Sequence, residues 1–263
     1  TGDILFMPYI GNARTQPGTQ QDPLSGYASL YSKDNEQALP GYYEVLLKTH
    51  NTKVELTASD RVAFHRYTFP KDAEKHVMIN LKDANGDDRP TNTYLEQMND
   101  TVIRGYRHST GWSKKQQIYF TAVFSQPIHL ALYHDSVQVA GNHLQGLDVK
   151  GNVSIVSTKE ELCVKVGISP VSMDNAMGNI QQEIKNWDFE KIVEETTKKW
   201  NTELSKLQVE TNNVAAKRVF YTALYHAFMQ PIMFNDYNKE YRGTDKSIYG
   251  DPEFTNYTVF SLW

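Results

Sequence analysis

The stretch Pro40-Gly41-Tyr42-Tyr43-Glu44-Val45-Leu46-Leu47 contains the pattern that decides the fold. A proline–glycine pair marks a turn, and after it the apolar side chains of Tyr43, Val45 and Leu47 recur at every second position. Successive side chains of a β-strand point to opposite faces of its sheet, so this period predicts a strand with one face in a core.

The same period recurs through the first 172 residues. Further apolar stripes are Val54 and Leu56, Val77 to Leu81, Ile118 to Phe124, and Leu162 to Ile168. Turn residues separate the stripes, and we expect turns at Asn85-Gly86, Ser125-Gln126-Pro127 and Gly151-Asn152. Many short strands at this spacing predict a mainly β fold with a two-sheet antiparallel β-sandwich.

Near Ser172 the period changes to that of a helix. Ser172 or Asp174 is expected to cap a helix that ends near Trp187. Asp188 is expected to cap a second helix, because the apolar residues that follow it lie on one helical face. These residues are Phe189, Ile192, Val193, Thr196, Trp200, Leu204 and Leu207. A third helix is expected over residues 214–229, before a proline ends it.

These patterns divide the chain into three parts. We expect a sandwich domain over residues 1–172, linker helices over residues 173–210 and the start of a second domain over residues 211–263. A domain seldom ends on an apolar cluster such as Phe260-Ser261-Leu262-Trp263. Two or three helices cannot close a helical core of their own, so the pattern predicts that the second domain is truncated.

Composition excludes several classes of function. Hydrophobic residues make up 40% and charged residues 22% of the 263 residues, which is typical of a folded globular chain. The net charge is −4 and the basic residues are scattered, which argues against a nucleic-acid partner. No apolar run approaches the roughly 18 residues that a membrane span needs. The chain starts at Thr1 without a signal peptide, so we expect either that processing removed that segment or that this is a piece of a longer protein.

The sequence contains no convincing catalytic motif. None of the eight histidines has a partner at His-x-x-x-His spacing, and no nucleophile elbow, phosphate-binding glycine loop or dinucleotide fingerprint occurs. Cys163, the only cysteine, lies in a strand pattern and is interpreted as a structural thiol. His65 is interpreted as a packed or surface histidine. The acidic loop 83–88 has its glycine too early for a calcium loop, so a hairpin turn is the better interpretation.

Two segments contain more residues of the types common in binding sites than the packing of a sandwich requires. The first runs from Gly105 to Ser113 and is interpreted as a loop between strands. Its candidate sugar ligands are Arg107, Ser109, Gly111, Trp112 and Ser113. A tryptophan ring can stack on a pyranose ring, and arginine and serine can bond its hydroxyls. The alternative is a hairpin loop whose tryptophan covers the core.

The second segment is Tyr241-Arg242-Gly243-Thr244-Asp245. Arg242 and Asp245 are its candidate ligands for a sugar. The alternative is that these two side chains simply form an ion pair at the surface.

Several of these stretches, taken in order, resemble glycoside hydrolase family 92. Residues 40–47, 54–61 and 64–70 resemble its "PGYYxVxL … ELTAT.R.gfHRYtFP" signature. Residues 31–38 resemble the segment that precedes this signature, with Lys33 in place of the usual histidine. The resemblance continues, in chain order, through residues 105–112, 187–189, 200–201, 220–226, 241–243 and 257–263, and so covers essentially the whole chain.

The resemblance implies an N-terminal β-sandwich joined by helices to a C-terminal (α/α)6 barrel, of which only the first elements would be present. Family members are calcium-dependent, exo-acting α-mannosidases, mostly bacterial and exported to the periplasm or cell surface, and they invert configuration. In the family the catalytic acid, the catalytic base and the main calcium ligands come from the barrel, beyond residue 263. The site lies between the two domains. Trp263 falls just before a "DTfR" stretch that contacts the sugar, and Thr1-Gly2-Asp3 resembles the end of a loop that approaches the site.

The leading hypothesis is therefore the N-terminal part of an α-mannosidase, of α-1,2 type, that acts on mannose-containing glycans. Its partner would be its own missing barrel domain, and the isolated chain would be inactive because it lacks the acid and the base. A second hypothesis is a non-catalytic carbohydrate-binding β-sandwich module. A third is a structural support that never contacts sugar. The helical segment after residue 172 argues against both alternatives, since a free-standing module has no use for part of a barrel.

Overall fold

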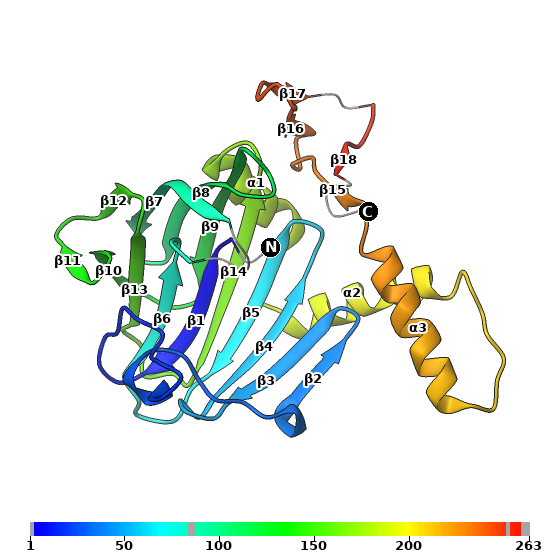
Figure 1. Cartoon of the computed structure of the whole chain (residues 1–263), viewed down its shortest axis with the longest axis horizontal. Helices are drawn as coiled ribbons and strands as arrows, with labels where there is room; N and C mark the ends of the chain where they lie inside the picture. Colours follow the sequence, from blue (N-terminus) through cyan, green and yellow to red (C-terminus); the bar gives the residue numbers. More distant parts are fainter. Residues whose placement is uncertain (1–2, 84–87, 251–252, 259–263) are drawn as a thin grey trace.

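A computed structural model describes residues 3–83, 88–250 and 253–258, and it confirms the antiparallel β-sandwich (Figure 1). Within these residues the smaller sheet has five strands, in the order β1 (Leu5–Ile10), β6 (Lys75–Asn80), β13 (Val149–Ile155), β10 (Ile128–His134) and β11 (Val137–Val139). The described part of the larger sheet has nine strands, in the order β12 (His143–Gly146), β7 (Arg89–Asn99), β8 (Val102–Thr110), β9 (Gln116–Phe124), β14 (Glu161–Ser169), β5 (Val62–Thr68), β4 (Thr52–Ala58), β3 (Tyr42–Leu47) and β2 (Glu36–Leu39).

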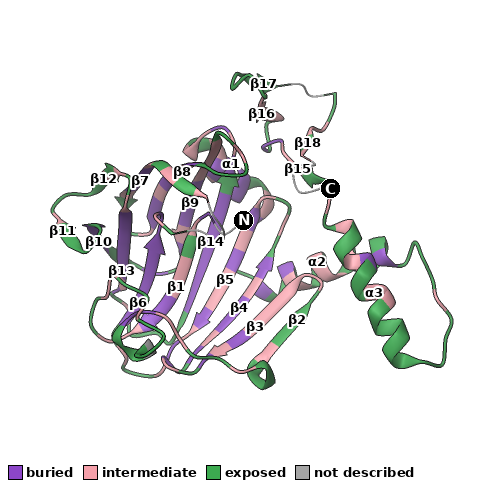
Figure 2. Cartoon of the chain, in the orientation of Figure 1, coloured by how far each residue is buried: buried purple, intermediate pink, exposed green. Residues whose placement is uncertain are grey.

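The main core lies between the two sheets, where strand residues at alternating positions are buried (Figure 2). On β9, for example, Phe120, Ala122 and Phe124 all belong to this core. On β14 the predicted stripe is buried from Leu162 to Val166, whereas Ile168, near the end of the strand, is 49% exposed. Apart from Ile118 and Ile168, the period-2 stripes of the sequence thus correctly predicted which side chains pack between the sheets.

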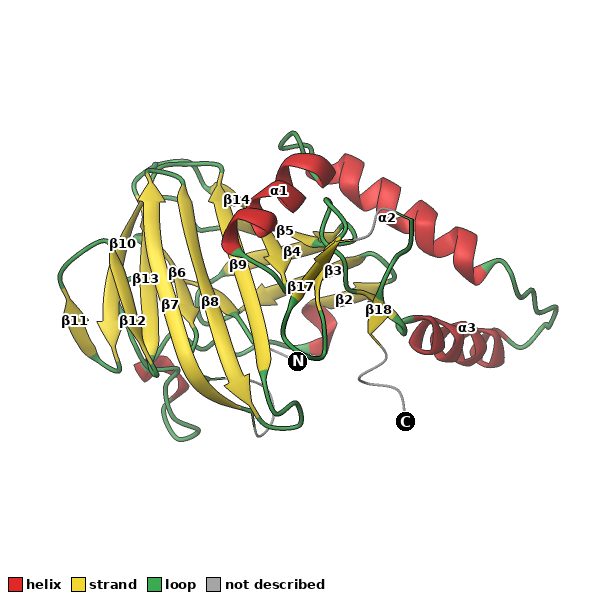
Figure 3. Ribbon diagram, turned by 90° about the horizontal axis from the view of Figure 1, so that it is seen from above, coloured by secondary structure: helices red, strands yellow, loops and turns green. Residues whose placement is uncertain are grey.

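Helices cover part of the outer face of the larger sheet (Figure 3). The helices of the described residues are α1 (Met173–Glu183), α2 (Phe189–Leu204) and α3 (Val214–Phe228). A second apolar cluster joins α1 and α2 to the strands beneath them, and its buried members are Val62, Phe64, Cys163, Ile180, Ile184, Phe189 and Ile192. Burial in this cluster raises the pKa of the Cys163 thiol to about 12, which agrees with a structural thiol.

The predicted starts of the helices agree with the structure, whereas the predicted ends of the first two do not. The second helix ends at Leu204, so Leu207 lies beyond it. Ser172 caps α1 by accepting from the Asn175 amide at 3.0 Å, and Asp188 caps α2. The third helix lies within the predicted range. The expectation that the first helix ends near Trp187 is wrong, because α1 ends at Glu183. Lys165 Nζ donates to the Ile184 carbonyl at 2.9 Å and lies 4.1 Å from the Trp187 ring, so buried contacts hold this connection outside the helix.

The expected turn at Gly151-Asn152 is also wrong, because both residues lie inside strand β13. A Cβ atom on Gly151 would lie 2.4 Å from a Leu95 side-chain carbon and 2.7 Å from one of Leu130. Asn152 is buried and accepts a hydrogen bond from the Tyr9 hydroxyl at 2.7 Å. Here glycine permits close packing and asparagine serves a buried hydrogen bond, so neither residue marks a turn. The turn expected at Asn85-Gly86 lies outside the described residues.

After α3 the chain returns toward the sandwich through two short hairpin-like pairs (Figure 1). Strand β15 (Ile232–Met233) pairs with β18 (Tyr257–Thr258), and β16 (Glu240–Arg242) pairs with β17 (Ile248–Gly250). Short 3-10 turns, η1 (Pro23–Ser25) and η2 (Lys33–Asn35), lie between β1 and β2. Among the described residues, no helix combines the length and apolar character needed to cross a membrane.

Replacing Gly167 with alanine tests how closely α1 packs on β14. A Cβ atom there would lie 2.2 Å from the Ala176 carbonyl oxygen and 2.8 Å from a side-chain carbon of Ile180. We expect Gly167→Ala to lower the free energy of unfolding by about 1–3 kcal/mol, as overpacking does. Gly250→Ala is the matched control, because its nearest new contact is 3.5 Å away, and a change within about 0.5 kcal/mol is expected there. Equal urea midpoints for the two variants would contradict this interpretation.

Candidate functional site: a cleft between the sandwich and the helices

A cleft of about 1010 Å³ lies where the larger sheet meets the helices. One side is lined by residues of β2, β3, β4 and β5, and the other by residues of α2, α3 and the chain just after α3. Small-molecule sites are commonly about 300–1,000 Å³. The cleft is therefore large enough for a ligand of more than one ring.

Aromatic rings and hydrogen-bonding groups both line the cleft. Trp200 of α2 and Tyr225 of α3 lie with their ring centroids 4.6 Å apart. Lys199 Nζ lies 3.0 Å from a carboxylate oxygen of Asp60 across the cleft. The Oε1 atom of Gln230 is buried and has no hydrogen-bond partner among the described residues. Rings that offer an apolar face beside unsatisfied polar atoms suit a polyhydroxylated ring such as a sugar.

His65, on β5, also lines the cleft. Its Nδ1 lies 2.7 Å from the Tyr67 hydroxyl, which can donate to the neutral ring, and the Phe6 ring meets it edge to face at 5.7 Å. Burial lowers the pKa of His65 to about 4. The ring is therefore neutral at physiological pH, and its contacts with Tyr67 and Phe6 agree with the packed or surface histidine predicted from the sequence.

The structure changes the interpretation of residues 105–113, because β8 extends to Thr110 and only the residues after it form a loop. The Arg107 side chain is 0% exposed and lies between the sheets. Its guanidinium donates to an Asp3 carboxylate oxygen at 2.8 Å, to the Leu81 carbonyl at 3.0 Å and to the Asp88 carbonyl at 3.3 Å. These bonds tie β8 to the chain segments beside it, and they direct the guanidinium toward the interior.

The other candidates of this segment differ in their accessibility. Ser109 is buried, and its hydroxyl has no hydrogen-bond partner among the described residues. A Cβ atom on Gly111 would lie 1.8 Å from an Asp88 carboxylate oxygen, so glycine is required by this contact. Trp112 is 67% exposed, and its amide donates to the same Asp88 carboxylate at 3.2 Å. Ser113 is partly buried and its carbonyl accepts from the Gly111 amide.

Arg242 and Asp245 do not pair with each other, and each forms hydrogen bonds with other residues. Arg242 donates to the carbonyls of Pro170 at 2.9 Å and Val171 at 3.1 Å. Asp245 accepts from the Tyr249 hydroxyl at 2.7 Å. The alternative of an ion pair between Arg242 and Asp245 is therefore wrong. Arg242 instead fixes β16 to the end of β14.

The fold brings the two predicted segments near one another, since burial and then the nearby charge of Arg242 lower the pKa of His108. Contacts of residues beside the segments agree with this. Arg242 lies 5.9 Å from the ring centroid of Tyr119 on β9, and Lys246 Nζ donates to the Lys115 carbonyl at 3.3 Å. Neither segment contributes a residue to the lining of the cleft within the described part of the chain. Trp263, the remaining candidate, lies outside the described residues.

Sequence reasoning missed a row of stacked rings on the larger sheet. Tyr94 and Tyr106 stack with centroids 5.5 Å apart, and Tyr106 stacks on His108 at 4.5 Å. Tyr106 stacks on both Tyr94 and His108, so the faces of this middle ring are covered by its neighbours. The alternation of Tyr106 and His108 is visible in the sequence, but their cross-strand neighbour is not.

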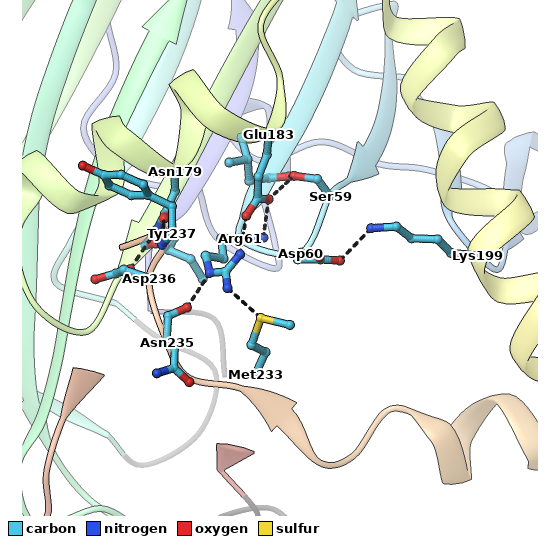
Figure 4. Close-up of polar contacts among 12 residues, drawn as sticks. Ser59, Asp60, Arg61, Asn179, Glu183, Lys199, Met233, Asn235, Asp236 and Tyr237 are labelled. Carbon is cyan, nitrogen blue, oxygen red and sulfur yellow. Dashed lines mark hydrogen bonds and ion pairs between the residues drawn. The ribbon is translucent and has the colours of Figure 1, made fainter. Parts of the chain in front are cut away.

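Sequence reasoning also missed a polar cluster near the cleft (Figure 4). Arg61 Nη1 lies 2.6 Å from a Glu183 carboxylate oxygen, and Arg61 Nε donates to the Asn235 carbonyl. The Ser59 hydroxyl donates to the same glutamate at 2.6 Å. The partners are separated by 122 to 174 residues, so no local pattern could have revealed them.

The described residues do not fit a calcium ion. Among them, no three His, Cys, Asp or Glu side chains gather as they would around a metal. The most enclosed carboxylate, Asp236, accepts hydrogen bonds from Ser169, Asn175 and Asn179 at 2.6–2.9 Å. Those donors occupy the oxygens that a cation would need.

The fold is an antiparallel sandwich with helices packed on the larger sheet and a cleft between them. Residues 1–169 match the "Glycosyl hydrolase family 92 N-terminal domain", and residues 175–263 match the "Glycosyl hydrolase family 92 catalytic domain". The chain belongs to glycoside hydrolase family 92.

Solved structures of this family resemble the chain closely. The family GH92 alpha-mannosidase BT3965 from Bacteroides thetaiotaomicron is 34% identical and has a TM-score of 0.94, and the match covers 100% of this chain and 36% of that protein. The GH92 family glycosyl hydrolase ccman5 is 25% identical, with a TM-score of 0.86 over 97% of this chain and 36% of its own. A fungal relative, an "Uncharacterized secreted glycosidase" of Arthroderma benhamiae, is 22% identical over 80% of this chain and 30% of its own length. The chain thus spans about a third of the length of these relatives.

Removing the Arg107 guanidinium tests whether its role is structural. Arg107→Met would leave the Asp3 carboxylate beside a buried apolar group, so we expect a loss of about 3–5 kcal/mol in the free energy of unfolding. Arg104→Met is the matched control, because Arg104 pairs with Glu96 and Asp174 nearer the surface and such pairs contribute about 1 kcal/mol or less. A small loss for Arg107→Met in chemical denaturation would favour the original interpretation as a ligand.

The lowered pKa of His65 predicts a dependence of stability on pH. The folded ring, with its pKa at about 4, stays neutral while the unfolded ring takes up a proton near pH 6.5. Stability is therefore complete above pH 6.5, falls as pH drops toward 4 and changes no further below it. Between pH 7 and pH 5 this costs the wild type roughly 2 kcal/mol.

The measurement compares urea unfolding at pH 7 and pH 5. We expect His65→Gln to lose this part of the pH dependence. His143→Gln, which removes an exposed ring, should follow the wild type. Identical pH dependence in wild type and His65→Gln would contradict the lowered pKa.

Proposed function

We propose that the chain is the N-terminal part of an exo-acting, inverting α-mannosidase of α-1,2 type that hydrolyses mannosides of glycans. The observation that carries this proposal is the match of the whole chain, at 34% identity and a TM-score of 0.94, to a family GH92 alpha-mannosidase. That relative has also been solved in complex with mannoimidazole. The cleft, with its aromatic rings and the unpartnered Oε1 atom of Gln230, supports the same class of ligand.

In this proposal the chain binds and orients the glycan but does not cleave it. Inversion needs a carboxylic acid to protonate the leaving oxygen and a carboxylate to activate water, roughly 6.5–9.5 Å apart. Both groups, and the calcium ligands, are proposed to lie in the catalytic domain beyond residue 263. Tyr225 and Trp200 would offer ring faces to the glycan, and Gln230 would accept from a hydroxyl.

Export to the periplasm or the cell surface is part of the proposal. The fungal relative is described as secreted, and extended glycans occur outside the cytoplasm. The only cysteine is a buried thiol, so the fold does not depend on the redox state of its surroundings.

The test compares the 263-residue chain with a protein that continues through a complete family 92 catalytic domain. Both are incubated with an α-1,2-mannobioside, and NMR follows the anomer that is released first. We expect the chain alone to release no mannose, and the longer protein to release β-mannose, because inversion of an α-linkage gives the β-anomer. A chelator is expected to abolish the activity of the longer protein if calcium is required.

Each contrary result removes a different part of the proposal. Hydrolysis by the chain alone would contradict the position of the acid and the base, and first release of α-mannose would contradict inversion. One observation, the 67% exposure of Trp112, supports the alternative of a non-catalytic binding module. If the chain bound mannobioside and Trp112→Ala abolished binding while Tyr225→Ala did not, the module would be the better interpretation.

A further inference from the structure

The chain that returns from α3 is fixed to the sandwich by a buried carboxylate. Asp236 is 1% exposed, although it lies in a turn between two short strands. Its carboxylate accepts from the Ser169 hydroxyl at 2.6 Å and from the side-chain amides of Asn175 at 2.9 Å and Asn179 at 2.8 Å. The three donors belong to the end of β14 and to α1, so one side chain joins the returning chain to both elements.

Arg61 makes a second connection from the opposite side (Figure 4). This residue lies in the turn between β4 and β5, and its side chain contacts Glu183 of α1 and the backbone of Asn235. The side chains of Arg61 and Glu183 are only 16% and 14% exposed. A shielded pair of this kind holds its geometry better than a surface pair does. By comparison, the pair between Asp60 and Lys199 is largely open to solvent.

Shape complementarity supports the same attachment. The Tyr237 ring packs so closely on α1 that a Cβ atom on Gly178 would lie 2.1 Å from a ring carbon. The Tyr237 amide donates to the Asn179 side chain at 2.8 Å. Residues 233–242, here called the return segment, are therefore held by polar bonds, ring packing and the Arg242 contacts described above.

The return segment is connected directly to the cleft. Gln230 and Pro231, which precede it, line the cleft, as do Ser59 and Asp60 beside Arg61. A shift of the return segment relative to the β4–β5 turn would therefore move one wall of the cleft relative to the other. The sandwich wall also contacts α2 directly, through the Thr196 hydroxyl to the Ala58 carbonyl at 2.7 Å and through Lys199 to Asp60, so the return segment sets the position of the wall that follows α3.

We propose that Arg61 and Asp236 form a two-point latch that sets the position of the return segment and, through it, the width of the cleft. Both are positioning residues, since neither is among the residues that line the cleft. The consequence for sugar binding rests on the proposed function of the cleft. The latch itself does not.

Hydrogen exchange of the 263-residue chain tests the latch. The reporters are the amides of Phe234, Asp236, Tyr237 and Lys239, each of which donates a hydrogen bond inside or next to the return segment. Asp236→Asn keeps the shape but replaces one acceptor oxygen with an amide donor, which then faces either Asn179 or the pair Ser169 and Asn175. Arg61→Met keeps an unbranched apolar side chain and removes the guanidinium donors. We expect both variants to exchange at least tenfold faster at these amides, and the Ala176 amide of α1 to change less than twofold.

Two further variants make the test decisive. Arg104→Met is the matched control, because Arg104 also joins the larger sheet to α1 and has no bond to the return segment among the described residues. It should leave the four reporters within twofold of wild type. Arg61→Lys can keep the pair with Glu183 but lacks the fork that also reaches Asn235, so we expect an intermediate rate. If Asp236→Asn or Arg61→Met fails to fold, Ser169→Ala, which removes one donor to Asp236, should still speed exchange severalfold.

Unchanged reporter exchange in the folded latch variants would overturn the latch. Equal acceleration by Arg104→Met would overturn it as well. Titration with α-1,2-mannobioside then separates the latch from the proposed function. We expect latch variants to bind three- to tenfold more weakly than wild type; unchanged affinity with accelerated exchange would overturn the role in cleft width. If wild type binds no sugar, the proposed function of the cleft fails, and the exchange rates still decide whether the latch exists.

Discussion

The double-sided burial of the central strands β5 and β14 is the constraint on which the rest of the structure depends. Their inner faces contribute Tyr67, Leu162 and Val164 to the core between the sheets. Their outer faces contribute Phe64 and Cys163 to a second core under α1 and α2. Because these strands bury both faces, separating them from the smaller sheet or from the helices would expose apolar surface to water. The free-energy cost is about 25 cal/mol for each Å² exposed. Helices α1 and α2 therefore share an apolar core with the larger sheet.

This constraint explains where the cleft forms. Because α1 and α2 are fixed on the outer face, α3 and the chain after it start from a defined position relative to β2–β5. The cleft walls come from segments far apart in the sequence, but each wall is attached to the same rigid base. A binding cleft needs such a base, since side chains that contact a ligand must keep their separation when it binds.

The sequence predicted the parts of this arrangement that depend on local repetition. The stripes of Phe120 to Phe124 and Leu162 to Val166, and the helix begun by Asp188, follow from side-chain period and capping alone. The prediction from sequence was wrong where one residue type occurs in two kinds of structure. Gly151 allows Leu95 and Leu130 to pack closely and marks no turn, and the residues before Thr110 continue a strand. The cleft could not be predicted, because its walls meet only through tertiary contacts.

Arg107 shows why polar residues are easily assigned to a ligand site from the sequence when their role is to make hydrogen bonds inside the fold. An arginine between glycines and near a tryptophan has the composition of a sugar site, yet its charge is matched by Asp3, 104 residues away. Asp236 and Arg61 are the opposite case. No sequence pattern assigned them a structural or binding role, yet they hold the return segment through partners at least 57 residues distant. A buried charge must find its partner inside the fold, whereas a ligand-binding group must keep a donor or acceptor free. Within the cleft lining, Gln230 has such an unpartnered atom, its Oε1.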